Sequence, residues 1–394
     1  MIPILLFAIG TKFVFVALWP FGPYQLSLVM AHRLHRFLPA PDFARISEKP
    51  RDNTLAICLC AYNEGAVSSD KIEGSSRLPE GTGHLGLCQS GSRWHGLDPR
   101  GYRGRIRPVV ESDRRGKNPR VESPRRTDWN PDRQFTDANV RIEPTDVAVL
   151  RCYFADPSVG CLCSNLRYVN ASQSATAFVG SAYWSFNGWS KGLETATGSV
   201  IGEDGSLFAI RRRLHRPVPN DLIDDIFVWL ATLLTGYRVV RAEELRSFET
   251  HTTEATDEFR RKARIARQSI HVHFELWPQP RWLDLWNLYK YINHCLLRRI
   301  SGCVLVAALL SFFTVASVPV LGPVIVFAVS GSFRLLFFAA WWARLGLAMT
   351  LLNVLLALAW NVVAAFQGQR PRPIIWEPPT SPRELGIGGK RATR

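Results

Sequence analysis

Asp204, the pair Asp224 and Asp225, and a run of arginines fall close together between residues 197 and 230. Asp204 lies in a glycine-rich turn, and the adjacent pair Asp224 and Asp225 stands at the start of a helical pattern. Three consecutive arginines begin at Arg211. Guanidinium groups bind phosphate and carboxylates hold divalent cations, so this set predicts a site for an anionic, metal-bound ligand. The structural alternative for Asp224 is a carboxylate that caps the free N–H groups of the helix.

The strand that would position such a ligand begins near Thr54. The apolar run from there to Glu64 is typical of a parallel strand that is covered on both faces and ends in a polar turn. Ligands of open α/β sheets bind at the carboxyl ends of the strands, so Asn63 and Glu64 become candidate ligand-binding residues. An ordinary turn between a strand and a helix is the alternative.

The second half of the chain alternates between helical and strand patterns. We expect a helix from Val149 and then a buried strand at Val159–Cys163. The later elements are an aromatic-rich amphipathic helix at 174–193, a short strand at 236–245 and a basic helix at 258–268. The aromatic residues of the first of these helices either pack in the core or stack on the rings of a bound ligand.

The chain has 394 residues, 47% of them hydrophobic, and a net charge of +15. A basic chain binds nucleic acid or anionic membrane and phosphate groups. No nucleic-acid-binding module is recognisable, whereas Arg and Lys flank the apolar segments, so we expect membrane lipids as partners and no nucleic acid. The eight cysteines lack the spacing of a zinc site and predict free thiols.

Apolar segments at both ends predict membrane anchoring. Residues 1–31 lack a basic n-region and a clear cleavage site, so they predict a retained anchor rather than a signal peptide. Residues 276–299 are rich in Trp and Tyr and suit the membrane interface, and 300–366 can form two or three spanning helices. The basic residues after the first anchor place a catalytic domain at 52–275 and a tail at 367–394 in the cytoplasm. The sequence thus predicts a multi-pass protein of the cell membrane.

Several motifs occur in the order found in one enzyme family. The string G-x-D-G-x-L-F-A-x-R-R begins at Gly202, D-D-x-x-V follows at Asp224, and the first strand ends in C-A-Y-N-E at Cys60–Glu64. These motifs resemble the membrane-bound family 2 glycosyltransferases, which include the cellulose, hyaluronan, chitin and poly-N-acetylglucosamine synthases. The family's first strand ends in P-A-x-N-E. The resemblance implies an α/β domain of the GT-A type, with a Rossmann-like mixed sheet, plus transmembrane helices at both ends.

The resemblance also assigns the donor site. Ala61, Asn63 and Glu64 match the turn that holds the nucleotide. Asp137 matches the family's D-x-D position and would bind the Mg²⁺ or Mn²⁺ that bridges the diphosphate of the donor. The second acid of that motif is Asn139 here, and a neutral amide is the weaker ligand.

The family's catalytic and acceptor residues match positions in the second half of the chain. Asp225, next to Asp224, matches the general base of an inverting transfer. Asp204, Arg211 and Arg264 match positions that bind acceptor or donor. The basic helix stands where the family carries Q-x-x-R-W, with Arg264 at the Arg but no Trp, which weakens any expectation of processive synthesis.

Residues 74–134 depart from the family. Between Ser92 and Arg133 there are twelve Arg or Lys and six Asp or Glu, with many Gly and Pro. The segment is either disordered or the product of a shifted reading frame. A one-base shift permits G-K-T-R-A-L-N, a string common in the family, at Gly116–Glu122. Resequencing the gene across these codons tests the shift.

The sequence therefore predicts a transferase with a nucleotide-sugar donor and a carbohydrate or lipid-linked acceptor. The first alternative is an inactive relative whose nucleotide-binding segment is disrupted. The second is a membrane scaffold or transporter, which would place charged residues within the apolar segments as a pathway. Lys12, Arg334 and Arg344 alone fit that description, and they lie near segment ends.

Overall fold

The computed structural model describes residues 2–35, 55–61, 85–90, 106–111, 132–137 and 144–316, except 203, 204, 217, 220, 221 and 278. For the strands between residues 55 and 137 it describes the backbone. The predicted segments after residue 316 lie outside these ranges.

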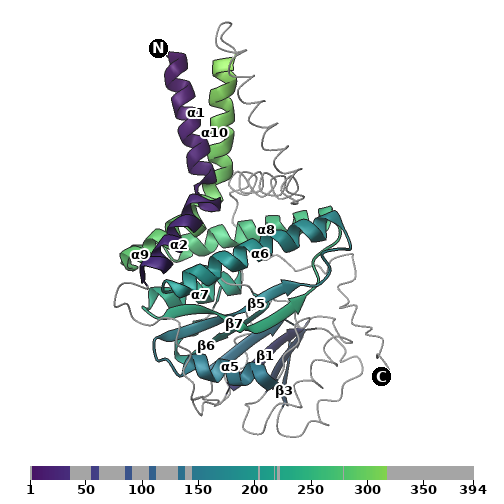
Figure 1. The fold of residues 1–394 in the computed structure, drawn as a ribbon. Helices are drawn as coiled ribbons and strands as arrows, with labels where there is room; N and C mark the ends of the chain where they lie inside the picture. The colour runs from purple at the N-terminus through teal and green to yellow at the C-terminus, as the bar shows by residue number, and fades with distance from the viewer. Residues whose placement is uncertain are drawn as a thin grey trace, which may run out of the picture.

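Seven strands form one mixed sheet in the order β3-β2-β1-β4-β6-β5-β7 (Figure 1). They are β1 (Leu55–Ala61), β2 (Leu85–Ser90), β3 (Ile106–Glu111), β4 (Asp132–Asp137), β5 (Val159–Tyr168), β6 (Leu207–Ile210) and β7 (Arg238–Glu249). Strand β1 pairs in parallel with β2 on one side and β4 on the other, so the prediction of an interior parallel strand is confirmed. Strand β6 is antiparallel to both β4 and β5, which makes the sheet mixed.

Strands β2 and β3 lie within the segment 74–134, where the residue pattern indicated no regular structure. Parallel pairing uses backbone groups, and these do not depend on an apolar repeat. Pro108 has no N–H to donate, yet it lies on β3, an edge strand of the sheet, where proline is tolerated. Pattern reasoning therefore missed two strands, while the segments that join them lie outside the described residues.

Helices cover both faces of the second half of the sheet. On β5, alternate residues such as Cys161 and Cys163 join a core cluster with α7 (Asp224–Leu234) and α8 (Ala255–Glu275). Helix α5 (Pro144–Phe154) packs on β5 and β7 from the opposite face. The long helix α6 (Ala175–Ala196) lies beside α8 between the sheet and the terminal helices (Figure 1). These helices and strands match the predicted ones in type and order.

The terminal helices form an antiparallel pair that projects from the sheet domain (Figure 1). Helix α1 (Ile2–Leu18) packs along α10 (Arg298–Ala316), with the rings of Phe7 and Phe312 5.6 Å apart. A 3-10 turn, η1 (Trp19–Phe21), ends α1 at Pro20, and α2 (Pro23–His35) leaves in a new direction.

The chain returns to this pair through residues 279–297. They form the 3-10 turn η5 (Gln279–Trp282), helix α9 (Leu285–Tyr291) and a π-helical segment, η6 (Ile292–Leu297), that runs directly into α10. Within the described residues, two stretches are long and apolar enough to cross a membrane: Ile4–Phe21 and Leu285–Val315.

Candidate active site

The register of the sheet brings three of the predicted motifs to one edge. Cys60 of β1 pairs with Asp137, the last residue of β4, so Ala61 and Asp137 end neighbouring parallel strands. Thr136 of β4 pairs in turn with Leu207, the first residue of β6. The backbones of Ala61, Asp137 and Leu207 therefore lie at the same edge, at the carboxyl ends of β1 and β4.

Asp225, the predicted general base, lies in the first turn of α7 and reaches the same edge of the sheet. A Cβ atom placed on Gly205 would lie 2.5 Å from Asp225 Oδ2, so only glycine leaves room for this carboxylate against the turn. The other oxygen of Asp225 accepts a 2.6 Å hydrogen bond from the N–H of Ile226. The side chain is half-buried.

The structural alternative for Asp224 does not fit the helix. Residue Ile223 occupies the N-cap position and no side chain caps the helix there, whereas Asp224 is the first helical residue. Its side chain is 7% exposed. A cap would stand one residue earlier and turn its oxygen back on the N–H groups of the first turn. Its predicted catalytic role stays a prediction.

Three buried hydroxyl groups anchor the far end of the glycine-rich turn. Ser206 follows Gly205, and its Oγ lies 3.3 Å from the Oγ of Ser247 on β7. The Oγ of Ser164 on β5 lies 2.7 Å from the same Ser247 oxygen. The trio fixes where the turn enters β6. Sequence reasoning missed it because a single serine on a strand carries no pattern.

Other predicted residues lie where their side chains are not described. Asn63, Glu64, Asn139 and Asp204 fall outside the described ranges, and Ala61 and Asp137 are described by their backbones. Their predicted roles stay predictions.

The structure corrects the prediction that Arg211 binds acceptor or donor. Arg211 directly follows β6, at the end of this strand that is opposite to the glycine-rich turn. Its backbone N–H donates to Gly160 O there. The buried guanidinium donates to the carbonyls of Val159 (2.6 Å), Phe154 (2.8 Å) and Asp156 (2.7 Å). The structure therefore does not bring Arg211 to the predicted site, and its contacts hold the turn between α5 and β5.

The substitution Arg211→Met tests this correction. It keeps the apolar stem but removes the donors from buried carbonyls, so we expect a loss of about 3 kcal/mol in unfolding free energy. The Michaelis constants of the folded enzyme should not change. A thermal melt and initial-rate kinetics on the same preparation measure both. A raised Michaelis constant for the donor at unchanged melting temperature would restore a binding role.

The second predicted arginine lies on α8. Arg264 is half-buried there. One turn earlier, Arg261 donates to the hydroxyl of Tyr168 at 3.3 Å and lies 3.6 Å from the carboxylate of Glu258. Burial raises the pKa of Tyr168, so this hydroxyl stays neutral. Arg261 is thus held by Glu258 of α8 and by Tyr168 at the end of β5.

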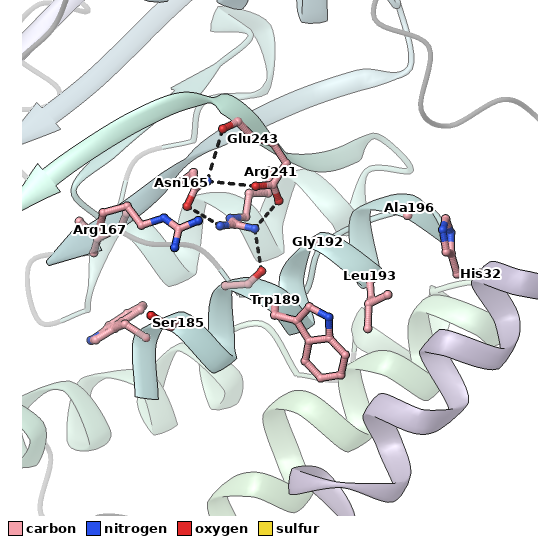
Figure 2. Close-up of a pocket in the computed structure, with 13 residues that line it drawn as sticks. His32, Asn165, Arg167, Ser185, Trp189, Gly192, Leu193, Ala196, Arg241 and Glu243 are labelled. Atoms are coloured by element: carbon pink, nitrogen blue, oxygen red, sulfur yellow. Dashed lines mark hydrogen bonds and ion pairs between the residues drawn. The ribbon is translucent and has the colours of Figure 1, made fainter. Parts of the chain in front are cut away.

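A cavity of about 470 Å³ runs along α6 (Figure 2). Arg241 and Glu243 of β7 form an ion pair on one side, and Arg241 also donates to Asn165 at 2.5 Å. Trp189 of α6, half exposed, and His32 of α2 stand on the other side. The ring of Trp184, which also lines the cavity, packs against Tyr168 with the centroids 6.1 Å apart. The wall therefore offers polar groups and one accessible aromatic face, and stacking on a sugar stays a prediction.

Gly205→Ala tests the contact between the turn and Asp225. The added methyl group would displace the carboxylate or the turn by about 1 Å, and we expect the turnover number to fall by about 10²-fold. Gly22→Ala is the matched control, because a Cβ there meets no atom within 4 Å. Equal activity of both variants would contradict the placement of Asp225 at the reacting centre.

Comparisons with known proteins agree with this architecture. No protein-family model matches the chain, and no curated protein sequence matches it. Among solved structures, the mannosyltransferase PcManGT from Pyrobaculum calidifontis, in complex with GDP-Man and Mn²⁺, aligns with a TM-score of 0.64 at 18% identity. The alignment covers 92% of this chain and 98% of that one.

Two other glycosyltransferases align less closely. GalNAc-T7 with UDP, GalNAc and Mn²⁺ has a TM-score of 0.42 at 11% identity, over 67% of this chain and 55% of that one. Glucosyl-3-phosphoglycerate synthase from Mycobacterium tuberculosis, with Mn²⁺, uridine diphosphate and phosphoglyceric acid, has a TM-score of 0.35 at 18% identity, over 56% and 78%. The mixed sheet and the alignment with PcManGT show that the chain has a glycosyltransferase fold of the GT-A type.

Proposed function

We propose that the chain is a metal-dependent, inverting glycosyltransferase that works at a membrane surface. It moves a sugar from a nucleotide-sugar donor to a carbohydrate or lipid-linked acceptor, and Asp225 is its general base. The observation that carries the proposal is the approach of Asp225 to the Gly205 turn at the edge where β1 and β4 end.

This geometry suits a single displacement. A base beside the turn takes the proton of an acceptor hydroxyl while that oxygen attacks the anomeric carbon. The donor already carries a good leaving group, so the protein contributes base catalysis and positioning. Asp224 and Asp204 hold the acceptor near Asp225 in this proposal, and Arg264 of α8 binds acceptor or donor.

The donor set at the end of β4 fits a divalent cation. Asp137 and Asn139 offer hard oxygen ligands, which Mg²⁺ and Mn²⁺ prefer, at the carboxyl edge of the parallel strands. Within the described residues there is no cluster of three metal-binding side chains, so the remaining ligands must come from the donor, from water or from residues outside those ranges. A bound cation would neutralise the departing diphosphate.

The terminal helices support work at a membrane. Helices α1 and α10 carry exposed apolar residues such as Leu5 and Phe313. On α2, Leu26, Met30 and Leu34 are exposed at every fourth residue and form one apolar stripe. A helix of this kind lies in the interface with its apolar face in the lipid. We propose that α1 and α10 are anchors and that the sheet domain lies on the cytoplasmic side.

Donor binding is the experiment that decides. The purified full chain is titrated by calorimetry with GDP-mannose and with a panel of UDP-sugars, each with and without Mn²⁺. Metal-dependent binding of one donor, followed by sugar transfer to membrane extracts, is the expected result. Inversion is read from the anomeric configuration of the product.

The unusual composition of residues 74–134 favours one other candidate, an inactive relative. It predicts that no donor binds, although the chain is folded by circular dichroism. Binding of a donor without transfer would also support it, provided that the acceptor is supplied by the source membranes.

A further inference from the structure

A polar face of the segment from α9 to α10 binds α6. It consists of four residues spaced by four: Trp286, Lys290, His294 and Arg298. In an α-helix, side chains four apart drift by about 40° per step, because a turn holds 3.6 residues. The π-helical turn at Ile292–Leu297 is wider and rotates the later residues back. All four side chains therefore meet the same partner helix.

The first two residues of this face bind the carboxyl end of α6 and the chain that follows it. Lys290 Nζ is fully buried and donates to the carbonyls of Ser199 (2.7 Å) and Glu194 (3.2 Å). The indole N–H of Trp286 donates to Thr197 O at 2.9 Å. These bonds satisfy carbonyls that a helix end leaves open, and they fix the path of the chain toward the glycine-rich turn.

The carboxylate of Glu194 is the centre of the contact. Its Oε1 accepts from the hydroxyl of Tyr24 on α2 at 2.5 Å and lies 2.6 Å from His294 Nδ1. Its Oε2 accepts from the backbone N–H of Ile201 at 2.8 Å. Glu194 is fully buried. Burial alone would raise the pKa of this carboxyl, but the interactions with His294, Tyr24 and the Ile201 N–H outweigh it and lower the pKa.

Ile201 is the residue before the glycine-rich turn, and the end of this turn lies against Asp225. Gly202 follows with φ of +101°, and the His294 ring stands beside it, since a Cβ on Gly202 would lie 3.7 Å from His294 Nε2. Gly205, four residues after Ile201, lies against Asp225. Glu194 thus fixes the start of the same turn whose end touches the proposed base.

We propose that Glu194 is a positioning residue for the transfer reaction: its Oε2 holds the Ile201 amide so that the turn presents Asp225 to the acceptor. The proposal rests on the proposed function of Asp225. Tyr24 of α2 and His294 of the π-helical segment contact the other oxygen of this carboxylate, Oε1. Glu194 itself touches no reacting atom.

Two substitutions of Glu194 test separately whether the length or the charge of this side chain matters. Glu194→Gln keeps the length, so its carbonyl oxygen still accepts from Ile201. Its amide group can donate to the hydroxyl of Tyr24 but loses the bond to His294, whose Nε2 accepts from Arg298 at 3.1 Å and whose Nδ1 therefore keeps its proton. Glu194→Asp keeps the charge but is one methylene too short to reach the Ile201 N–H. We expect the turnover number to stay within about threefold for the Gln variant and to fall at least about tenfold for the Asp variant.

Two readouts distinguish positioning from loss of structure. The dissociation constant for the donor should be unchanged in both variants, because the predicted nucleotide-binding and metal-binding residues follow β1 and β4. Hydrogen exchange of the peptide containing residues 199–206 should be faster in the Asp variant and near that of the native protein in the Gln variant. This second readout does not need activity, so it tests the inference even if the proposed function fails.

Tyr24→Phe is the control, since it removes one bond to Oε1 and leaves the bond to Ile201. It should keep the native exchange rate and turnover. Native turnover and native exchange in the Asp variant would overturn the inference. So would a loss in the Gln variant as large as that in the Asp variant, because the Gln variant keeps the bond to Ile201. A native protein that binds no donor would instead overturn the proposed function.

Discussion

Replacing Asp225 by asparagine is expected to lower the turnover number of sugar transfer by about 10³-fold, equivalent to about 4 kcal/mol of activation free energy. Asparagine has nearly the same shape and still accepts from the Ile226 N–H, so α7 and the Gly205 contact should remain. What is lost is the group that takes the acceptor proton. Donor affinity should stay within about twofold, since no proton moves on binding. Steady-state kinetics and donor calorimetry on the same preparation measure both quantities.

Asp284→Asn is the matched control for this substitution. Asp284 is the N-cap of α9 and accepts from the N–H groups of Trp286 and Asn287, and asparagine caps helices equally well. The control removes a carboxylate elsewhere in the chain and should keep native turnover. If Asp225→Asn also kept native turnover, Asp225 would not be the base.

The helices and strands of the second half were predictable because their residues alternate between apolar and polar at the period of each element. The helical stripe of α5 and the aromatic face of α6 each mark one buried side, whereas β5 is a continuous apolar run because helices cover both of its faces. The start of α7 at Asp224 was predicted for the same reason. Strands β2 and β3 were missed because no such pattern marks them.

The residues of the candidate site were likewise predictable only in part. Asp225 and Gly205 were predicted to act together, and the structure brings them into contact. Arg211 was assigned to the site because it is near Asp204 in sequence, but a four-residue strand carries it to the other end of the sheet. Only strand direction decides that, and a motif does not encode it.

Glu194 was missed for a different reason. It is a single acid in an aromatic helix, and its partners Tyr24 and His294 lie 170 and 100 residues away in the chain. No local pattern marks such a contact. The available signal was thermodynamic: a carboxylate on the apolar face of a helix must find donors, because burying an unpaired charge costs several kcal/mol.

Removing divalent cations is expected to lower sugar transfer by about 10³-fold, because the charge of the departing diphosphate would then be neutralised by protein groups alone. Added Mn²⁺ or Mg²⁺ should restore the activity after chelation with EDTA. Asp137→Asn should raise the Mn²⁺ concentration needed for half-maximal rate, since an amide oxygen is a weaker ligand than a carboxylate. Asp132→Asn is the control on the same strand: Asp132 begins β4 beside Leu55, at the opposite end from Asp137. The two variants carry the same change in charge, so an equal Mn²⁺ requirement in both would show that the end of β4 does not bind the metal, whereas a shift confined to Asp137→Asn would locate the cation at the edge where β1, β4 and the Gly205 turn meet.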